Sequence, residues 1–83
     1  MDDSSRQPQE APYQALIKPG DAVETPDGEL WVVLGALPDE LLQLVSAYRA
    51  QDGRIWADAY EPTRTVLAVG LVAKVADARQ VGP

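Results

Sequence analysis

A hairpin signature between residues 17 and 37 constrains the fold more than any other part of the sequence. A Pro-Gly-Asp turn at residues 19–21 precedes a short run through Val23, and Pro-Asp-Gly at residues 26–28 then reverses the chain. An Asp-Gly pair suits a tight reversal because glycine takes positive φ freely and aspartate tolerates it. The apolar run from Leu30 to Leu34 contains tryptophan and valine, which favour the half-buried surface of a sheet. The stretch therefore predicts two antiparallel strands.

The second strand of this hairpin is apolar on both of its faces. Side chains alternate along a strand, so one face carries Leu30, Val32 and Leu34, and the other carries Trp31, Val33 and Gly35. Val23 is the inward residue of the first strand. A strand of this kind is either covered on both sides within one chain or lies in a subunit interface, which leaves a homo-oligomer open. Trp31 is predicted to belong to the core or to such an interface rather than to a ligand site.

The composition excludes several kinds of chemistry. At 83 residues the chain has room for one domain, and it contains neither cysteine nor histidine. Disulfides, thiolate zinc sites and imidazole-based acid–base catalysis are therefore excluded. The serines lack a base to activate them, and the paired carboxylates stand in predicted turns, where they are expected to be solvated. We predict a protein that is not an enzyme, with no catalytic residues, no metal and no cofactor.

The charge balance bears on the partners. Thirteen acidic residues stand against seven basic ones, for a net charge of −6. Nucleic acids and anionic membrane surfaces attract basic proteins, so neither is an expected partner, and a protein partner is expected to be neutral or basic. The amino terminus lacks the pattern of a secretory signal, and a cytoplasmic location is expected. The composition, rich in Ala, Val and Leu with arginine favoured over lysine, is typical of a GC-rich bacterium or its mobile elements.

Taken in order, the chain divides into a tail and one domain. Residues 1–12 are polar and interrupted by proline, which predicts a disordered tail. Residues 13–78 are expected to form a single small β domain, and residues 79–83 a loose C-terminus. The stretch from residue 76 to residue 83 fits a loose end or one helical turn. The last regular element spans residues 65–75, with Gly70 marking a bulge or bend.

Residues 39–51 fit two structures almost equally well. As a helix, the segment places Leu41, Leu44, Val45 and Tyr48 on one stripe, with Asp39 and Glu40 in the first turn. As a strand, it places Leu42, Leu44 and Tyr48 on one face, and Asp52-Gly53 becomes a second hairpin turn. The strand is the preferred interpretation because strands are predicted on either side. The alternative is an α+β domain with this helix on a four-stranded antiparallel sheet.

The candidate binding surface lies on the segment from residue 54 to residue 61, which alternates as a strand should. Ile55, Ala57 and Ala59 are predicted to point inward, and Trp56, Asp58 and Tyr60 outward. With Asp52-Gly53 as a two-residue turn, Arg49 would lie across from Trp56. Two aromatic rings with a carboxylate between them suit a peptide or a cationic side chain. The predicted partner-binding residues are therefore Trp56, Tyr60, Arg49 and Asp58. The competing interpretation is that these rings cover the core.

The opening of the hairpin resembles a known architecture. Gly-Asp-Ala-Val at residues 20–23, Pro-Asp-Gly at 26–28 and Trp-Val-Val at 31–33 are similar to the start of SH3-like small barrels, including KOW and Tudor modules. The resemblance covers residues 17–37 and implies a mostly β barrel of about five antiparallel strands. Type II dihydrofolate reductases are similar in size and in this opening. Their catalytic Val-Gln-Ile-Tyr stretch is missing, however, because Thr65 to Ala68 stands there instead.

Three hypotheses for function follow. The leading one is a non-enzymatic module that binds a protein partner through the aromatic and acidic face. The second is an acidic inhibitor that mimics nucleic acid, encoded by a phage or plasmid, with Asp21, Glu24, Asp27 and Glu29 among its carboxylates. The third is an oligomeric barrel enzyme of the type II dihydrofolate reductase kind, which would need a symmetric pore.

Overall fold

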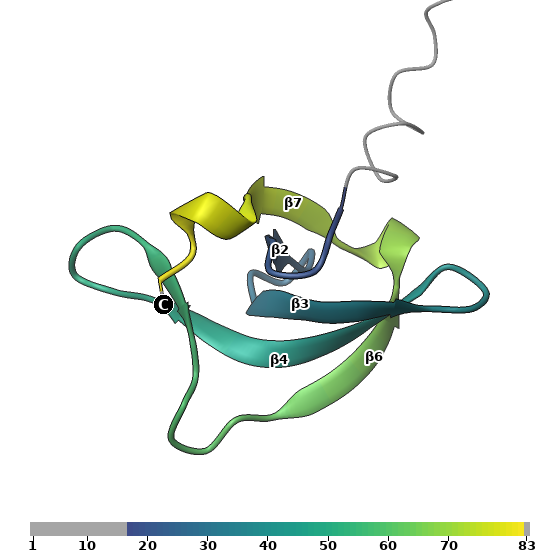
Figure 1. Ribbon diagram of the computed structural model, residues 1–83, viewed down its shortest axis with the longest axis horizontal. Coiled ribbons are helices and arrows are strands. Elements are labelled where there is room, and N and C mark those ends of the chain that lie inside the picture. Colours follow the sequence, from purple (N-terminus) through teal and green to yellow (C-terminus); the bar gives the residue numbers. More distant parts are fainter. Residues whose placement is uncertain (1–16, 83) are drawn as a thin grey trace, which may run out of the picture.

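The computed structural model describes residues 17–82, which form one six-stranded antiparallel sheet with two short 3-10 turns (Figure 1). The predicted tail, residues 1–12, lies outside the described residues. The strands are β2 (Ala22–Glu24), β3 (Leu30–Leu37), β4 (Leu41–Arg49), β5 (Ile55–Ala57), β6 (Arg64–Ala68) and β7 (Ala73–Ala76), and the 3-10 turns are η1 (Val69–Leu71) and η2 (Ala78–Gln80). The mostly β, antiparallel prediction is confirmed, and the sheet is open rather than closed into a barrel.

Strand β4 organises the sheet. The strand order is β5-β4-β3-β2-β7, and β6 also pairs with β4. The first half of β4 pairs with β6, from Leu41 opposite Ala68 to Val45 opposite Arg64. Its last three residues pair with β5, from Ala47 opposite Ala57 to Arg49 opposite Ile55. Residues 58–63 connect β5 to β6 and therefore leave the sheet between these two pairings.

The helix alternative for residues 39–51 is wrong. Asp39 and Glu40 have φ angles of 66° and 59°, so the backbone is left-handed where a helix would begin. Val45 pairs with a residue of β3 on one edge of β4 and with a residue of β6 on the other. These hydrogen-bonded partners come from segments distant in the sequence, and they outweigh a local helical pattern. The predicted stripe is consequently divided between the two faces of a strand.

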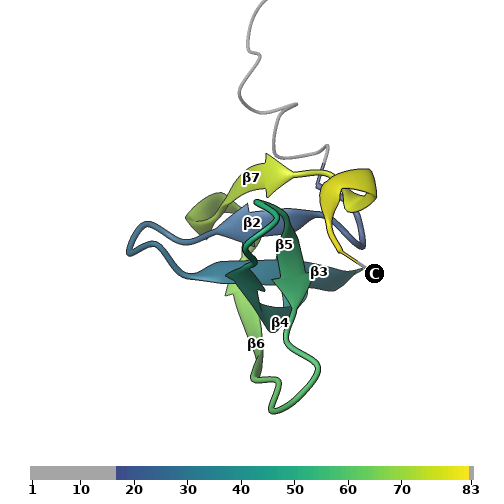
Figure 2. The same ribbon diagram turned by 90° about the vertical axis from the view of Figure 1, so that its left-hand side faces the viewer.

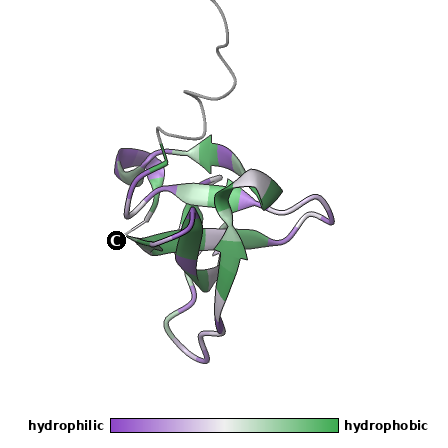
Figure 3. Cartoon of the chain, turned by 90° about the vertical axis from the view of Figure 1, so that its right-hand side faces the viewer, coloured by the Kyte–Doolittle hydropathy of each residue, from purple (hydrophilic) through white to green (hydrophobic). Residues whose placement is uncertain are grey.

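Both faces of the hairpin strand β3 are covered within the chain. One cluster of buried apolar residues consists of Val23, Trp31, Val33, Leu42, Leu44 and Val72. On the opposite face, Ala22 pairs with Val32 and Val32 with Val45, and all three side chains are buried. Ile55 is also buried, and its strand β5 lies near β3. Burial on both faces therefore needs no subunit interface, and Trp31 is a core residue. In Figure 3 the apolar colour lies mainly on the strands and the polar colour on the turns.

One residue of this strand departs from the predicted alternation. Leu34 was expected to share a face with Val32, yet its side chain is 48 % exposed. The register between β3 and β4 shifts between Val33 and Gly35, so one extra residue stands in β3 at this point. A bulge of this kind turns a side chain out of the regular alternation.

The C-terminal segment, residues 77–82, connects two distant strands of the open sheet. It follows β7, passes through η2, and reaches β5, where Val81 pairs with Ile55 and the Gly82 amide donates to the Ile55 carbonyl at 2.8 Å (Figure 1). Asp77 and Gln80 cap η2 reciprocally. The Asp77 carboxylate accepts from the Arg79 amide, and the Gln80 side chain accepts from the Asp77 amide. A hydrogen bond from Arg79 lowers the pKa of the Asp77 carboxyl. Residues 79–82, expected as a loose end or one helical turn, carry these contacts.

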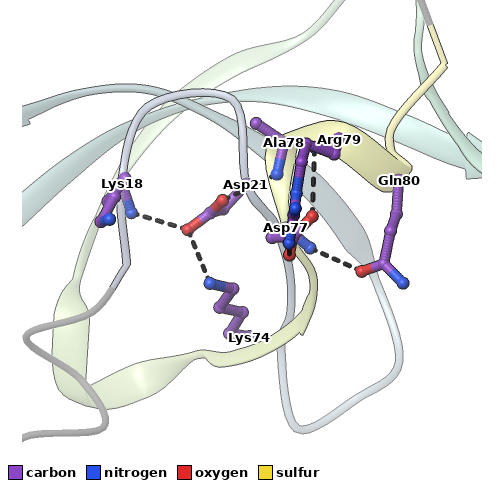
Figure 4. Close-up of polar contacts among 7 residues, drawn as sticks. All are labelled: Lys18, Asp21, Lys74, Asp77, Ala78, Arg79 and Gln80. Atoms are coloured by element: carbon purple, nitrogen blue, oxygen red, sulfur yellow. Dashed lines mark hydrogen bonds and ion pairs between the residues drawn. The ribbon is translucent and has the colours of Figure 1, made fainter.

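A buried carboxylate holds the start of this segment (Figure 4). Asp21 is only 2 % exposed and accepts hydrogen bonds from the Lys18 amide at 2.8 Å and the Ala78 amide at 3.0 Å. The Lys74 ammonium lies 3.3 Å from the same carboxylate. A buried charge is tolerated when it is paired and hydrogen-bonded in this way. Asp21 thus joins the turn before β2, strand β7 and the turn η2.

Candidate functional site

The strand predicted over residues 54–61 ends at Ala57, so the predicted outward face is divided. Trp56 lies in β5, whereas Asp58 and Tyr60 lie in the loop of residues 58–63. The chain leaves the sheet here because β5 pairs only with the last three residues of β4, and β6 pairs with the first half of β4. The prediction that Trp56 and Tyr60 stand four residues apart along one strand is therefore wrong.

Ser46 closes the 58–63 loop at both of its ends. The Asp58 amide donates to the Ser46 carbonyl, and the Ser46 amide donates to the Thr63 carbonyl, both at 2.8 Å. The Ser46 hydroxyl accepts from the Thr63 amide, also at 2.8 Å. Figure 2 shows the loop extending away from β5 and β6. A single half-buried serine of β4 thus fixes the two points at which the loop leaves the sheet.

Within the loop, the carboxylate of Asp58 accepts hydrogen bonds from loop amides, and the ring of Tyr60 is exposed to solvent. One oxygen of Asp58 accepts from the amides of Tyr60 at 3.0 Å and Glu61 at 3.4 Å. The Tyr60 side chain is 96 % exposed. Asp58, predicted to contact the partner, also shapes the backbone that presents Tyr60.

The hairpin between β4 and β5 has a different register from the predicted one. The Ala50 amide donates to the Arg54 carbonyl, which leaves a three-residue loop, and Gly53 has a φ of 84°. Three-residue hairpin loops commonly end with a glycine in this left-handed region. The longer loop moves the register by one residue, so Tyr48 rather than Arg49 faces Trp56, and Arg49 faces Ile55.

Tyr48 and Trp56 line an open hollow beside this hairpin, with a volume of about 590 Å³. The Tyr48 side chain is 50 % exposed. Trp56 is half-buried because the backbone of Gly82 lies against its indole ring, where a Cβ atom would clash. Within residues 17–82 the buried indole nitrogen of Trp56 has no hydrogen-bond partner. Arg49 also borders the hollow, and its guanidinium donates to the Gly53 carbonyl at 3.1 Å.

Three aromatic residues lie in β4, in its partner strand β5 and in the loop that follows β5, and we call Tyr48, Trp56 and Tyr60 the aromatic edge. Of the predicted site residues, Trp56 and Arg49 border the same hollow, while Asp58 and Tyr60 belong to the neighbouring loop. Sequence reasoning missed Tyr48. A signal was present, because Gln51-Asp52-Gly53 repeats the Pro26-Asp27-Gly28 pattern of the first hairpin, whose loop is also three residues long and ends in a glycine with φ of 92°.

Among residues 17–82, no three acidic side chains come together as a group that could hold a metal ion. Asp21, expected among the carboxylates of an acidic surface, points inward and is buried. No helix in the described part of the chain is long and apolar enough to cross a membrane.

Comparison of the chain with known protein families, with curated proteins and with solved structures finds no match.

Proposed function

We propose that this chain is a small, non-enzymatic protein-interaction module of SH3-like architecture, which binds a protein partner through its aromatic edge. The observation that carries the proposal is the full exposure of Tyr60 on a loop closed at both ends by Ser46. Tyrosine buries a large apolar area and also makes a hydrogen bond, which is why it is frequent among the residues that dominate binding energy.

The loop geometry supports this proposal because it lowers the entropic cost of binding. An unstructured loop must be ordered on association, whereas the hydrogen bonds that the Ser46 hydroxyl and the Asp58 carboxylate accept from loop amides already hold the backbone around Tyr60. Tyr48 adds a second exposed ring beside an open hollow. Short antiparallel strands joined by tight hairpins support the SH3-like architecture.

The proposal is tested by comparing the proteins that bind the wild-type chain and two tyrosine variants. Purified chain immobilised through its N-terminus is exposed to a lysate of the source cells, and bound proteins are quantified by mass spectrometry. The variants Tyr60→Ser and Tyr48→Ser are expected to lose at least one protein that the wild type retains. With that protein purified, calorimetry is expected to show roughly tenfold weaker binding or more for Tyr60→Ser.

Leu71→Ser is the matched control, because Leu71 is 55 % exposed but lies in η1, at the opposite end of the molecule from the β4–β5 hairpin (Figure 1). The control is expected to retain the partner. Loss of the same protein by Leu71→Ser, or its retention by both tyrosine variants, would contradict the proposal.

A further inference from the structure

We propose that the hairpin end of the protein binds a short acidic segment of its protein partner, through a groove bordered by Arg49, Arg54 and Arg79. This inference rests on the proposed function and names the chemistry of the partner. It differs from the expectation drawn from net charge, because three of the five arginines border one groove on a chain whose net charge is negative.

The arginine groove lies where the β4–β5 hairpin meets the C-terminal segment. Its volume is about 510 Å³, and Ile55, Val75 and Ala76 contribute apolar atoms to its lining. Arg49 is the last residue of β4 and Arg54 directly precedes β5, so both stand beside the hairpin loop, and Arg79 lies in η2. Asp52 is a carboxylate in the same lining, and its oxygen accepts from the Arg54 amide at 2.9 Å.

Arg54 is fixed by the carbonyls of the C-terminal segment. Its Nε donates to the Gln80 carbonyl, and its Nη2 donates to the carbonyls of Arg79 and Val81, each at 3.2 Å. A guanidinium has five N–H donors in a planar fork, so these bonds leave the two on Nη1 for another acceptor. The charge is therefore positioned before any ligand arrives, which reduces the cost of binding.

Among residues 17–82, Arg49 and Arg79 each use one guanidinium nitrogen in a hydrogen bond or ion pair, which leaves most of their donors without an acceptor there. Arg49 uses Nη1 for the Gly53 carbonyl, and Arg79 uses Nη2 for the Asp77 carboxylate at 3.2 Å. The Arg79 side chain is 91 % exposed. Guanidinium groups bind carboxylates with paired, parallel hydrogen bonds, so three of them around one groove favour an anionic ligand.

The distribution of the acidic residues limits the length of that ligand. Exposed carboxylates stand in the other turns: Asp27 and Glu29 between β2 and β3, Asp39 and Glu40 between β3 and β4, and Glu61 in the 58–63 loop. The β3–β4 turn and the β4–β5 hairpin lie at opposite ends of the molecule (Figure 1). A long polyanion such as a nucleic acid would extend toward these carboxylates and be repelled. A short peptide with a few carboxylates would not.

The neighbouring hollow supports a peptide with apolar residues as well. The arginine groove and the hollow of Tyr48 and Trp56 share Arg49 and Asp52 in their linings. A peptide whose carboxylates occupy the groove can therefore place an apolar side chain against Tyr48. The expected ligand combines acidic residues with an apolar residue at intervals.

Fluorescence anisotropy tests this inference with the labelled peptide EDLEDL. We expect saturable binding to the full chain that weakens as salt is raised, and little binding of the basic peptide KKLKKL. Arg49→Glu and Arg79→Glu are each expected to weaken EDLEDL binding roughly tenfold or more. Arg64→Glu is the matched control, since it makes the same charge change at an exposed site in β6. Unchanged unfolding midpoints confirm that the variants are folded.

Several outcomes would overturn the inference. These are no saturation by EDLEDL up to about 1 mM, tighter binding of an oligothymidylate than of EDLEDL, or an equal loss for Arg64→Glu and Arg49→Glu. The capture experiment of the proposed function, repeated with Arg49→Glu and Arg79→Glu, separates the two proposals. A partner that is lost by Tyr60→Ser and retained by Arg49→Glu and Arg79→Glu would remove the arginine groove from the interface while leaving the aromatic edge in place.

Discussion

Two irregular segments adjoin β5 and have opposite effects on an aromatic side chain. The C-terminal segment pairs with Ile55 and lies against the ring of Trp56, whereas the 58–63 loop leaves Tyr60 fully exposed. The first segment is held by the buried, charged Asp21, and the second by the half-buried, neutral Ser46. The difference indicates that the C-terminal segment packs against the sheet and covers part of it, while the loop is a surface held in a defined shape.

Removal of the buried carboxylate is expected to have the largest effect. Asp21→Ala deprives the amides of Lys18 and Ala78 of their acceptor and leaves Lys74 without its partner. We expect the free energy of unfolding to fall by about 3 kcal/mol, measured by urea denaturation. Glu29→Ala removes an exposed carboxylate at the next turn and is expected to change stability by less than about 0.5 kcal/mol. Equal losses for the two variants would mean that Asp21 does not hold the C-terminal segment.

A side chain at position 82 is expected to have the next largest effect, because it would separate the C-terminal segment from Trp56. The Cβ of Gly82→Ala clashes with the indole ring, and overpacking of this kind costs roughly 1–2 kcal/mol. The indole N–H signal of Trp56 should shift and exchange faster with solvent in NMR spectra. Gly70→Ala serves as the control, because a Cβ there meets no atom within 4 Å. An unshifted Trp56 signal in Gly82→Ala would show that the segment does not cover the ring.

The loop is expected to respond more weakly to loss of its serine hydroxyl. Ser46→Ala removes the bond from the Thr63 amide and retains the two backbone bonds of residue 46. Stability should fall by about 1 kcal/mol, and the amides of residues 58–63 should become more mobile in NMR relaxation measurements. If Ser46→Ala weakens partner binding without loss of fold, the fixed shape of the loop contributes to affinity. Loop mobility equal to that of the wild type would contradict this role of the hydroxyl.

The smallest expected effect is on pH dependence at η2. The hydrogen bond from Arg79 lowers the folded-state pKa of Asp77 below its ordinary value of 3.8. The stability from this pairing is therefore present above that ordinary value and is lost as pH falls through the lower folded-state pKa. Amide chemical shifts of residues 78–80 should follow this titration. In Arg79→Gln the midpoint should move up toward the ordinary value, and an unchanged midpoint would contradict the assignment.

Local signals in the sequence determined the first hairpin and the class of fold. Turn residues with positive φ and β-favouring side chains act on their immediate neighbours, so they can be interpreted from a short stretch. The same signals failed at Asp39 and Glu40, where the local pattern fitted a helix nearly as well as a strand. Pairing of β4 with β3 and β6 decided between them.

The tertiary structure alone decided how the candidate site is assembled. Strand β5 ends at Ala57 because β6, and not β5, pairs with the first half of β4. Trp56 is covered because the C-terminal segment lies against its ring. Asp21 and Ala78 meet although they are 57 residues apart in the sequence. Contacts across such distances depend on where the whole chain places each segment, whereas the alternation of residues 54–61 describes only the preference of a strand for its own neighbours.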